Sequence, residues 1–104
     1  MVLVKVYFWA ARKDAEKKKI LLEPCAPREE LKGYFLGLLG NIPGIDIEKV
    51  IPRDIDSDFG AEVHFFIKRP NAIKTEEGFR GWVIGILSLY LPPGIDIRGV
   101  EIED

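Results

Sequence analysis

Residues 31–39 read LKGYFLGLL, and residues 79–87 read FRGWVIGIL, which repeats the same residue types in the same order 48 positions later. Further along, the stretch PGIDI at 43–47 recurs letter for letter at 93–97, 50 positions later. A repeat of this kind indicates that one structural unit occurs twice in the chain.

The bulk properties fit one soluble domain. A length of 104 residues predicts a single domain, residues 1–104, whose repeated halves we place at about 1–53 and 61–104. With 47% hydrophobic residues, 31% charged residues and a net charge of −2, the chain is neither disordered nor strongly attracted to polyanions. It has no Gln, one Thr, two Ser and two Asn beside abundant Ile, Lys and Glu, a bias typical of thermophilic proteins.

The first half reads as strand, helix, strand. Apolar residues alternate from Val2 to Phe8, which predicts a strand over 2–9 with one buried face. Apolar residues at positions 31, 34, 35, 38 and 42 keep helical spacing, which predicts an amphipathic helix over 27–40. A second strand is expected to run through Ile47 to about residue 53.

The second half repeats this order. An alternating strand begins at Ala61, Thr75 is a suitable N-cap for the second helix, and the last strand covers 95–103. In both halves the alternation slips early in the last strand, at Lys49 and at Gly99. Each slip predicts a β-bulge or the true start of the strand at that point.

Two β-α-β units joined by a short hairpin predict an α+β fold. The arrangement resembles the ferredoxin-like two-layer sandwich, βαββαβ, which implies a four-stranded antiparallel sheet in the order 4-1-3-2 with two helices on one face. An insertion at about 10–26 separates the first strand from the first helix, because the strands align at an offset of 59 and the helices at 48. Small duplicated domains of this kind are similar to uncharacterised families from heat-loving microbes, and we expect no characterised family to match.

The sequence also indicates the cellular compartment in which the protein works. The single Cys25 excludes an internal disulfide and fits a reducing cytoplasm. The longest apolar run, 82–91, is about half the roughly 20 residues that a bilayer requires, and no signal-peptide pattern is present. We therefore expect a cytoplasmic protein without a membrane partner and without a cofactor.

The strand alternation defines a sheet face that points away from the helices. Aromatic, charged and polar residues of the two central strands lie there: Lys5, Tyr7, Trp9, Glu62, His64 and Phe66. Monomers rarely leave an aromatic patch bare, so we expect this face to be covered. A second subunit is the favoured cover, and the insertion folding back over the sheet is the alternative.

The helices are more apolar than one buried face requires. The surplus residues are Leu36, Leu39, Ile84, Leu87 and Leu91. Each helix also carries glycines four residues apart, at 33 and 37 and at 81 and 85. Because a helical glycine costs about 1 kcal/mol relative to alanine, these pairs predict close approach to a neighbouring element.

The first functional hypothesis follows from this surplus of apolar surface. We expect a noncatalytic binding or assembly module that self-associates, with a homodimer favoured, through the open sheet face or the outer helix surface.

A second hypothesis is binding of RNA or single-stranded DNA. Aromatic residues on the central strands resemble the stacking platform of the RNA recognition motif, although GAEVHFF at 60–66 lacks the signature of that motif. Basic residues that could contact phosphate lie in the insertion: Arg12, Lys13, Lys17, Lys18 and Lys19. A solvated lysine-rich loop is the favoured explanation of these residues, so nucleic acid is the less favoured partner.

A third hypothesis is a small enzyme acting on an anionic substrate near Arg12, Lys13 and Cys25. Cys25 needs a base, and His64 is expected away from it on the sheet face, so catalysis is not favoured. Residues 10–14 carry neither the glycine cradle of acylphosphatases, nor the Cys-x-x-Cys of heavy-metal-binding domains, nor the glycine turn of ACT-type regulatory domains. The resemblance to those families stops at the fold.

A weak metal candidate lies between the halves. Asp54, Asp56 and Asp58 resemble the start of a calcium-binding loop. Phe59 stands where such a loop needs glycine, and Phe65 where it needs a bidentate glutamate, so we predict no metal site.

Overall fold

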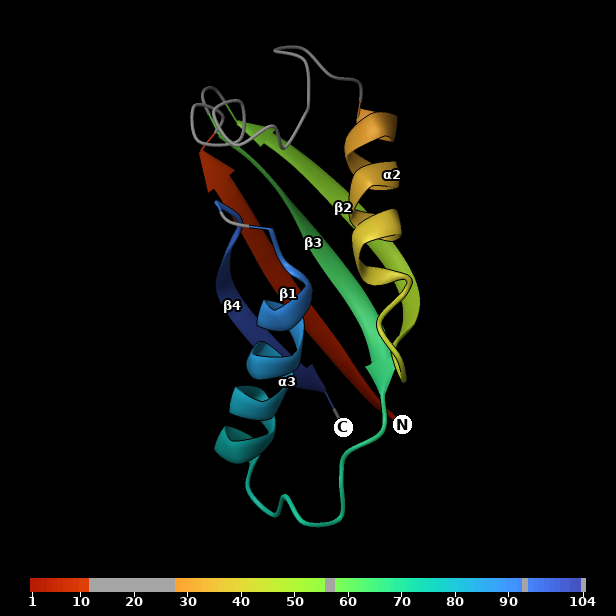
Figure 1. The fold of residues 1–104 in the computed structure, drawn as a ribbon, viewed down its shortest axis with the longest axis vertical. Coiled ribbons are helices and arrows are strands. Elements are labelled where there is room, and N and C mark those ends of the chain that lie inside the picture. Colours follow the sequence, from red (N-terminus) through yellow and green to blue (C-terminus); the bar gives the residue numbers. More distant parts are fainter. Residues whose placement is uncertain (12–27, 56–57, 93, 104) are drawn as a thin grey trace.

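A computed structural model describes residues 1–11, 28–55, 58–92 and 94–103 of the chain (Figure 1). The elements follow the predicted order of strand, helix, two strands, helix and strand. Their bounds are β1 (Val2–Ala11), α2 (Arg28–Leu39), β2 (Asp46–Ile55), β3 (Asp58–Ile67), α3 (Glu76–Tyr90) and β4 (Asp96–Glu103).

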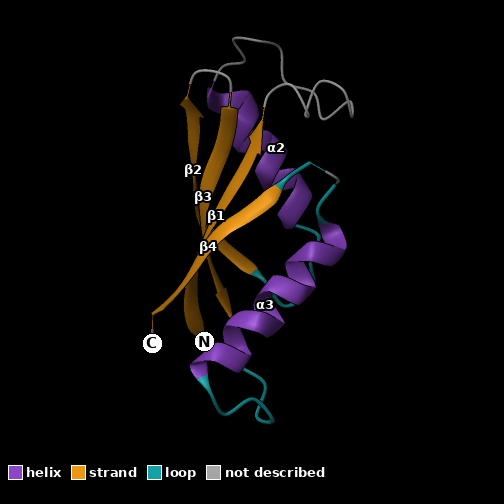
Figure 2. Ribbon diagram, turned by 90° about the vertical axis from the view of Figure 1, so that its left-hand side faces the viewer, coloured by secondary structure: helices purple, strands orange, loops and turns teal. Residues whose placement is uncertain are grey.

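The four strands form one antiparallel sheet in the order β2-β3-β1-β4, which reads 4-1-3-2 from the β4 edge. Strands β1 and β3 are central, and β2 and β4 are the edges. Both helices lie on the same side of the sheet (Figure 2). Helix α2 packs mainly on β2 and α3 on β4. The predicted α+β class, with an antiparallel sheet and two helices, is confirmed.

Both edge strands carry the predicted bulge. In β2, Ile47 and Lys49 face consecutive residues of β3, which leaves Glu48 as the extra residue. In β4, Ile97 and Gly99 face consecutive residues of β1, which leaves Arg98 as the extra residue. Each bulge increases the local twist of its strand and interrupts the regular ladder there.

The turns that lead into the two edge strands require glycine. Gly44 has a φ of +83° and Gly94 a φ of +99°. L-residues with a side chain rarely adopt this left-handed region, which explains glycine in both copies of PGIDI.

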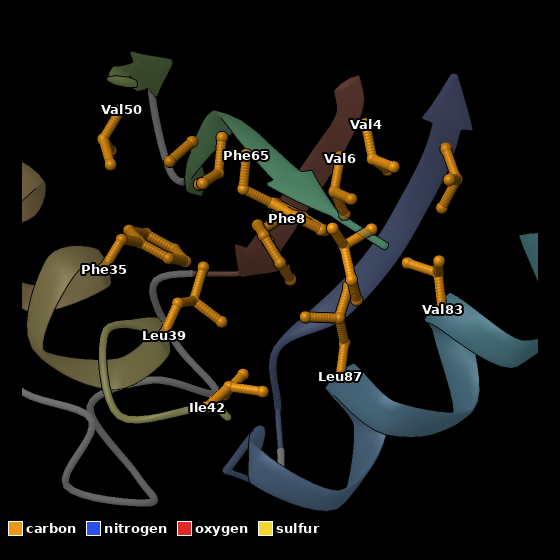
Figure 3. Close-up of a cluster of buried hydrophobic side chains, with 14 of the residues drawn as sticks. Val4, Val6, Phe8, Phe35, Leu39, Ile42, Val50, Phe65, Val83 and Leu87 are labelled. Carbon is orange, nitrogen blue, oxygen red and sulfur yellow. The ribbon is translucent and has the colours of Figure 1, made fainter. Parts of the chain in front are cut away.

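A continuous apolar core fills the space between the sheet and the helices (Figure 3). Phe8 of β1 meets Phe35 of α2 with ring centroids 5.5 Å apart. On α3, Phe79, Val83 and Leu87 are buried at helical spacing. The helix begins as predicted, because the Thr75 side chain accepts a hydrogen bond from the backbone N–H of Gly78 at 3.0 Å.

The prediction that Leu39 and Leu87 are surplus was wrong, because both are fully buried in the core (Figure 3). Leu38, expected in the core stripe, is only partly buried and packs at its rim. The surplus instead comprises exposed residues of both helices: Leu36 (40% exposed), Ile84 (36%), Leu89 (82%) and Tyr90 (42%). Leu91 is partly buried against the core.

The close approach predicted for the helix glycines was also wrong. No described atom would meet a Cβ within 4 Å at Gly33, Gly37, Gly81 or Gly85. These positions precede or follow the core residues Phe35 and Val83 by two, which is roughly 200° around a helix with 3.6 residues per turn. The glycines therefore face outward, away from the sheet.

Some predicted residues lie outside the described ranges. These are the basic residues of the insertion, the cysteine and one aspartate: Arg12, Lys13, Lys17, Lys18, Lys19, Cys25 and Asp56. Asp54 and Asp58 belong to the backbone of β2 and β3.

Candidate functional site

The register of β1 and β3 brings the predicted sheet-face residues together. Lys5 lies opposite His64, and Tyr7 lies opposite Glu62. Trp9 lies opposite Gly60, and Phe66 lies opposite Leu3. Alternation along both strands puts these side chains on the face away from the helices.

Strand β4 adds two acidic residues to this face that the sequence reasoning missed. Lys5 Nζ lies 2.8 Å from Glu103 Oε1, and the Tyr7 hydroxyl donates to Glu101 Oε2 at 3.2 Å. The signal was present, because the order 4-1-3-2 places β4 beside β1. Glu101 then lies opposite Lys5 and Glu103 opposite Leu3, so both carboxylates reach their partners on β1 diagonally.

These contacts change the titration of the groups involved. Hydrogen bonding to Glu103 raises the pKa of Lys5, and the same contact lowers the pKa of Glu103. Hydrogen bonding to Glu62, together with desolvation and the charge of Glu101, raises the pKa of Tyr7 to about 12. Tyr7 thus stays a neutral hydrogen-bond donor between two carboxylates over the physiological pH range.

His64 is the one buried polar residue among those that the structure describes, at 6% exposure. Its Nε2 atom lies 3.0 Å from Glu62 Oε2. Trp9 has the guanidinium of Arg98, from the β4 bulge, 5.9 Å from its ring centroid. The central part of the face is therefore a set of charged and polar groups that already contact one another.

The charge of this face is predominantly acidic. Among the residues whose side chains the structure describes, five carboxylates have registers that put them on it: Asp46, Glu62, Asp96, Glu101 and Glu103. Within the same set, the cations there are Lys5, Lys49 and Arg98. Nucleic-acid surfaces place Lys and Arg, rather than carboxylates, beside the stacking aromatics, so this charge weighs against phosphate contacts.

A different surface lies on the far side of the molecule. We define the outer helix surface as the exposed apolar residues Leu36, Ile84 and Leu89 together with the outward glycines at 33, 37, 81 and 85. The sequence has no charged residue from 33 to 41 or from 81 to 90. Solvent-facing helix surfaces are normally polar or charged, so this surface departs from the usual pattern.

The described residues offer little else that could hold a ligand. Within them no pocket is found and no group of three His, Cys, Asp or Glu side chains could hold a metal ion. Neither of the described helices is long and apolar enough to cross a membrane.

No protein-family model, curated protein or solved structure matches the chain. The expectation that no characterised family would match is confirmed. What defines the protein is therefore its own architecture: an α+β domain with an antiparallel four-stranded sheet, one polar sheet face and one uncharged helix surface.

Proposed function

We propose that this domain is a noncatalytic binding and assembly module that contacts other protein through its outer helix surface. The observation that carries this proposal is the exposed and uncharged character of that surface on both helices. Leu89 is 82% exposed, and Leu36 and Ile84 are each more than a third exposed. Large apolar side chains left exposed beyond scattered single residues mark interaction sites in soluble proteins.

The two sheet edges are poorly suited to pairing with a strand of another protein, which also favours the outer helix surface as the docking site. Each edge strand has a bulge, at Glu48 in β2 and at Arg98 in β4. Strand β2 also contains Pro52, which lacks a backbone donor. Bulges, proline and charged side chains are devices that prevent strand addition at a sheet edge.

The sheet face is the less favourable docking surface. Its central ionisable groups already have partners within the chain, as in the contacts of Lys5 with Glu103 and of His64 with Glu62. A partner seated there would desolvate these charges, and desolvation of ion pairs commonly costs as much as their attraction returns. Burying uncharged helix surface carries no such cost.

We infer a ferredoxin-like sandwich, built from duplicated halves at about 1–53 and 61–104, that works in the cytoplasm of a heat-loving organism. The matching bulges and the paired positive-φ glycines of the two PGIDI turns support the duplication. The composition supports the thermal assignment.

The proposal is tested by site-specific photo-crosslinking in cells that express the protein natively. A photoreactive phenylalanine analogue replaces Ile84 on the outer helix surface. In a matched variant it replaces Ile51, which lies opposite Glu62 and therefore on the sheet face. We expect protein adducts from position 84 and few from position 51. Adducts from position 51 alone, or none from position 84, would contradict the assignment of the helix surface.

A further inference from the structure

We propose that Arg80 of α3 blocks the open edge of β4 and so prevents another strand from adding to the sheet there. The inference goes beyond the proposed function, because it concerns a sheet edge rather than the outer helix surface. It is carried by the hydrogen bond that Arg80 Nε donates to the backbone oxygen of Val100 at 3.1 Å.

Of the two sheet edges, that of β4 is the more open to pairing. Strand β2 contains Pro52 in addition to its bulge, and proline cannot donate a backbone hydrogen bond. Strand β4 contains no proline. Beyond its bulge at Arg98, residues 100–103 continue in an unbroken antiparallel register with β1. An edge segment of this kind can pair with another strand unless something covers its backbone groups.

Arg80 covers one of the backbone acceptors that such pairing would need. In an antiparallel ladder, the N–H and C=O of one residue point to the same side of the strand, and successive residues alternate between its two sides. Strand β4 has β1 on one side only. Because the Val100 oxygen accepts a hydrogen bond from a helix side chain, it is placed on the open side, together with the Val100 N–H. A charged donor binds this oxygen more strongly than a backbone N–H of an added strand would.

Further contacts hold Arg80 at this edge. Its Nη2 atom lies 3.4 Å from Oε1 of Glu76, one turn earlier on the same helix. Helix α3 itself packs on β4. The Arg80 side chain is 39% exposed, so most of it lies against the protein rather than in solvent. A strand that approached the edge of β4 would therefore have to displace this side chain as well as break its hydrogen bond to Val100.

The test compares self-association of purified full-length variants, because every copy of the chain presents the same β4 edge to the others. Arg80→Gln keeps an N–H donor at the side-chain position of Nε, whereas Arg80→Met places a methyl group there. Lys32→Met makes the same change of charge and apolarity on α2 and is the matched control. Sedimentation equilibrium is run in about 0.5 M salt, which screens repulsion between the glutamates of two β4 strands. We expect Arg80→Met to associate on the order of tenfold more tightly than the wild type, and the other two variants to change by no more than about twofold.

Circular dichroism establishes that each variant is folded, and amide hydrogen exchange shows which edge pairs. In Arg80→Met, the Val100 N–H is expected to exchange more slowly as the protein concentration rises, because a strand of another copy then covers it. If Arg80→Met loses stability but associates no more tightly than the wild type, Arg80 only holds α3 on β4 and the proposal is wrong. Equal association of Lys32→Met also overturns it. In the wild type, a Val100 N–H as strongly protected as that of Glu101 would place the Val100 carbonyl in the ladder with β1, which contradicts the proposal.

Discussion

At the scale of single residues, Tyr7 has the most unusual environment on the sheet face. Its single O–H donates to Glu101, and the nearby carboxylate of Glu62 also favours the protonated phenol, so Tyr7 interacts with both strands that flank β1. Because of these carboxylates, the Tyr7 hydroxyl of the folded protein keeps its proton to a higher pH than it would in the unfolded chain.

The raised pKa of Tyr7 predicts a loss of stability in alkali. An unfolded tyrosine titrates near 10, whereas Tyr7 titrates at about 12. Between these values the folded state binds more protons than the unfolded state, so the free energy of unfolding falls as pH rises. The raised pKa values of Tyr34 and Lys5 act in the same direction.

Ultraviolet titration of the phenolate and urea unfolding at several pH values check this prediction. Glu62→Gln is expected to lower the pKa of Tyr7 toward 10, and Tyr7→Phe serves as the control that removes its signal. A Tyr7 pKa unchanged by Glu62→Gln would show that Glu62 is not the main cause.

Leu87 and Leu89 offer a second comparison between residues, on one helix. Leu87→Ala opens a cavity in the core and is expected to cost roughly 2–5 kcal/mol of unfolding free energy. Leu89→Ala removes a mostly exposed side chain and is expected to change it by less than about 0.5 kcal/mol. Urea denaturation, at protein concentrations that keep the chain monomeric, measures the unfolding free energy of both variants. Equal losses of unfolding free energy would contradict the burial of Leu87.

At the scale of elements, the strands were more predictable than the helices. A strand with one buried face alternates with a period of two, so a single slip at Lys49 or Gly99 is visible in the sequence. A helix that is apolar on nearly all sides has no periodic pattern that identifies its buried face. Leu36 and Leu39 therefore looked equivalent, and only the packing of α2 against β2 separates the exposed residue from the buried one.

The glycines of the helices and strands differ in the space around them, so substitution by alanine is expected to change stability in opposite directions. Gly81→Ala in α3 is expected to stabilise the monomer by about 1 kcal/mol, since alanine favours the helix and the space is open. Gly60→Ala in β3 is expected to destabilise it, because the new Cβ would collide with the backbone carbonyl oxygen of Phe8. Thermal unfolding compares the two variants, and a stabilising Gly60→Ala would contradict the close packing of β3 on β1.

At the scale of the whole molecule, charge is concentrated on one side. The sheet face holds the ionisable cluster around Lys5, Tyr7 and His64, whereas the outer helix surface is uncharged. Sequence alternation predicted which residues of β1 and β3 share the sheet face. The expected strand order was enough to place the two glutamates of β4 on this face. Their contacts with Lys5 and Tyr7 depend on the register of β4 against β1, so they needed the three-dimensional arrangement.

This separation predicts how association responds to salt. If copies meet through the outer helix surface, no charge pairs form between them, and salt screens only the overall repulsion between two negatively charged copies. Raising the salt concentration from about 0.05 M to about 1 M should therefore leave the dissociation constant unchanged or lower it. Sedimentation equilibrium across the series measures this. A constant that rises steeply with salt would instead indicate charge pairing through the sheet face.

The order β2-β3-β1-β4 also has a consequence for how the chain comes to be folded. The two strands of the first half, β1 and β2, are not neighbours, and each is hydrogen-bonded to β3 of the second half. A nascent chain that has emerged only as far as residue 55 therefore has no sheet to form. The two halves share two repeated stretches of sequence, but their strands alternate in one sheet, so neither half is a foldable unit until the ribosome has supplied strands from the other.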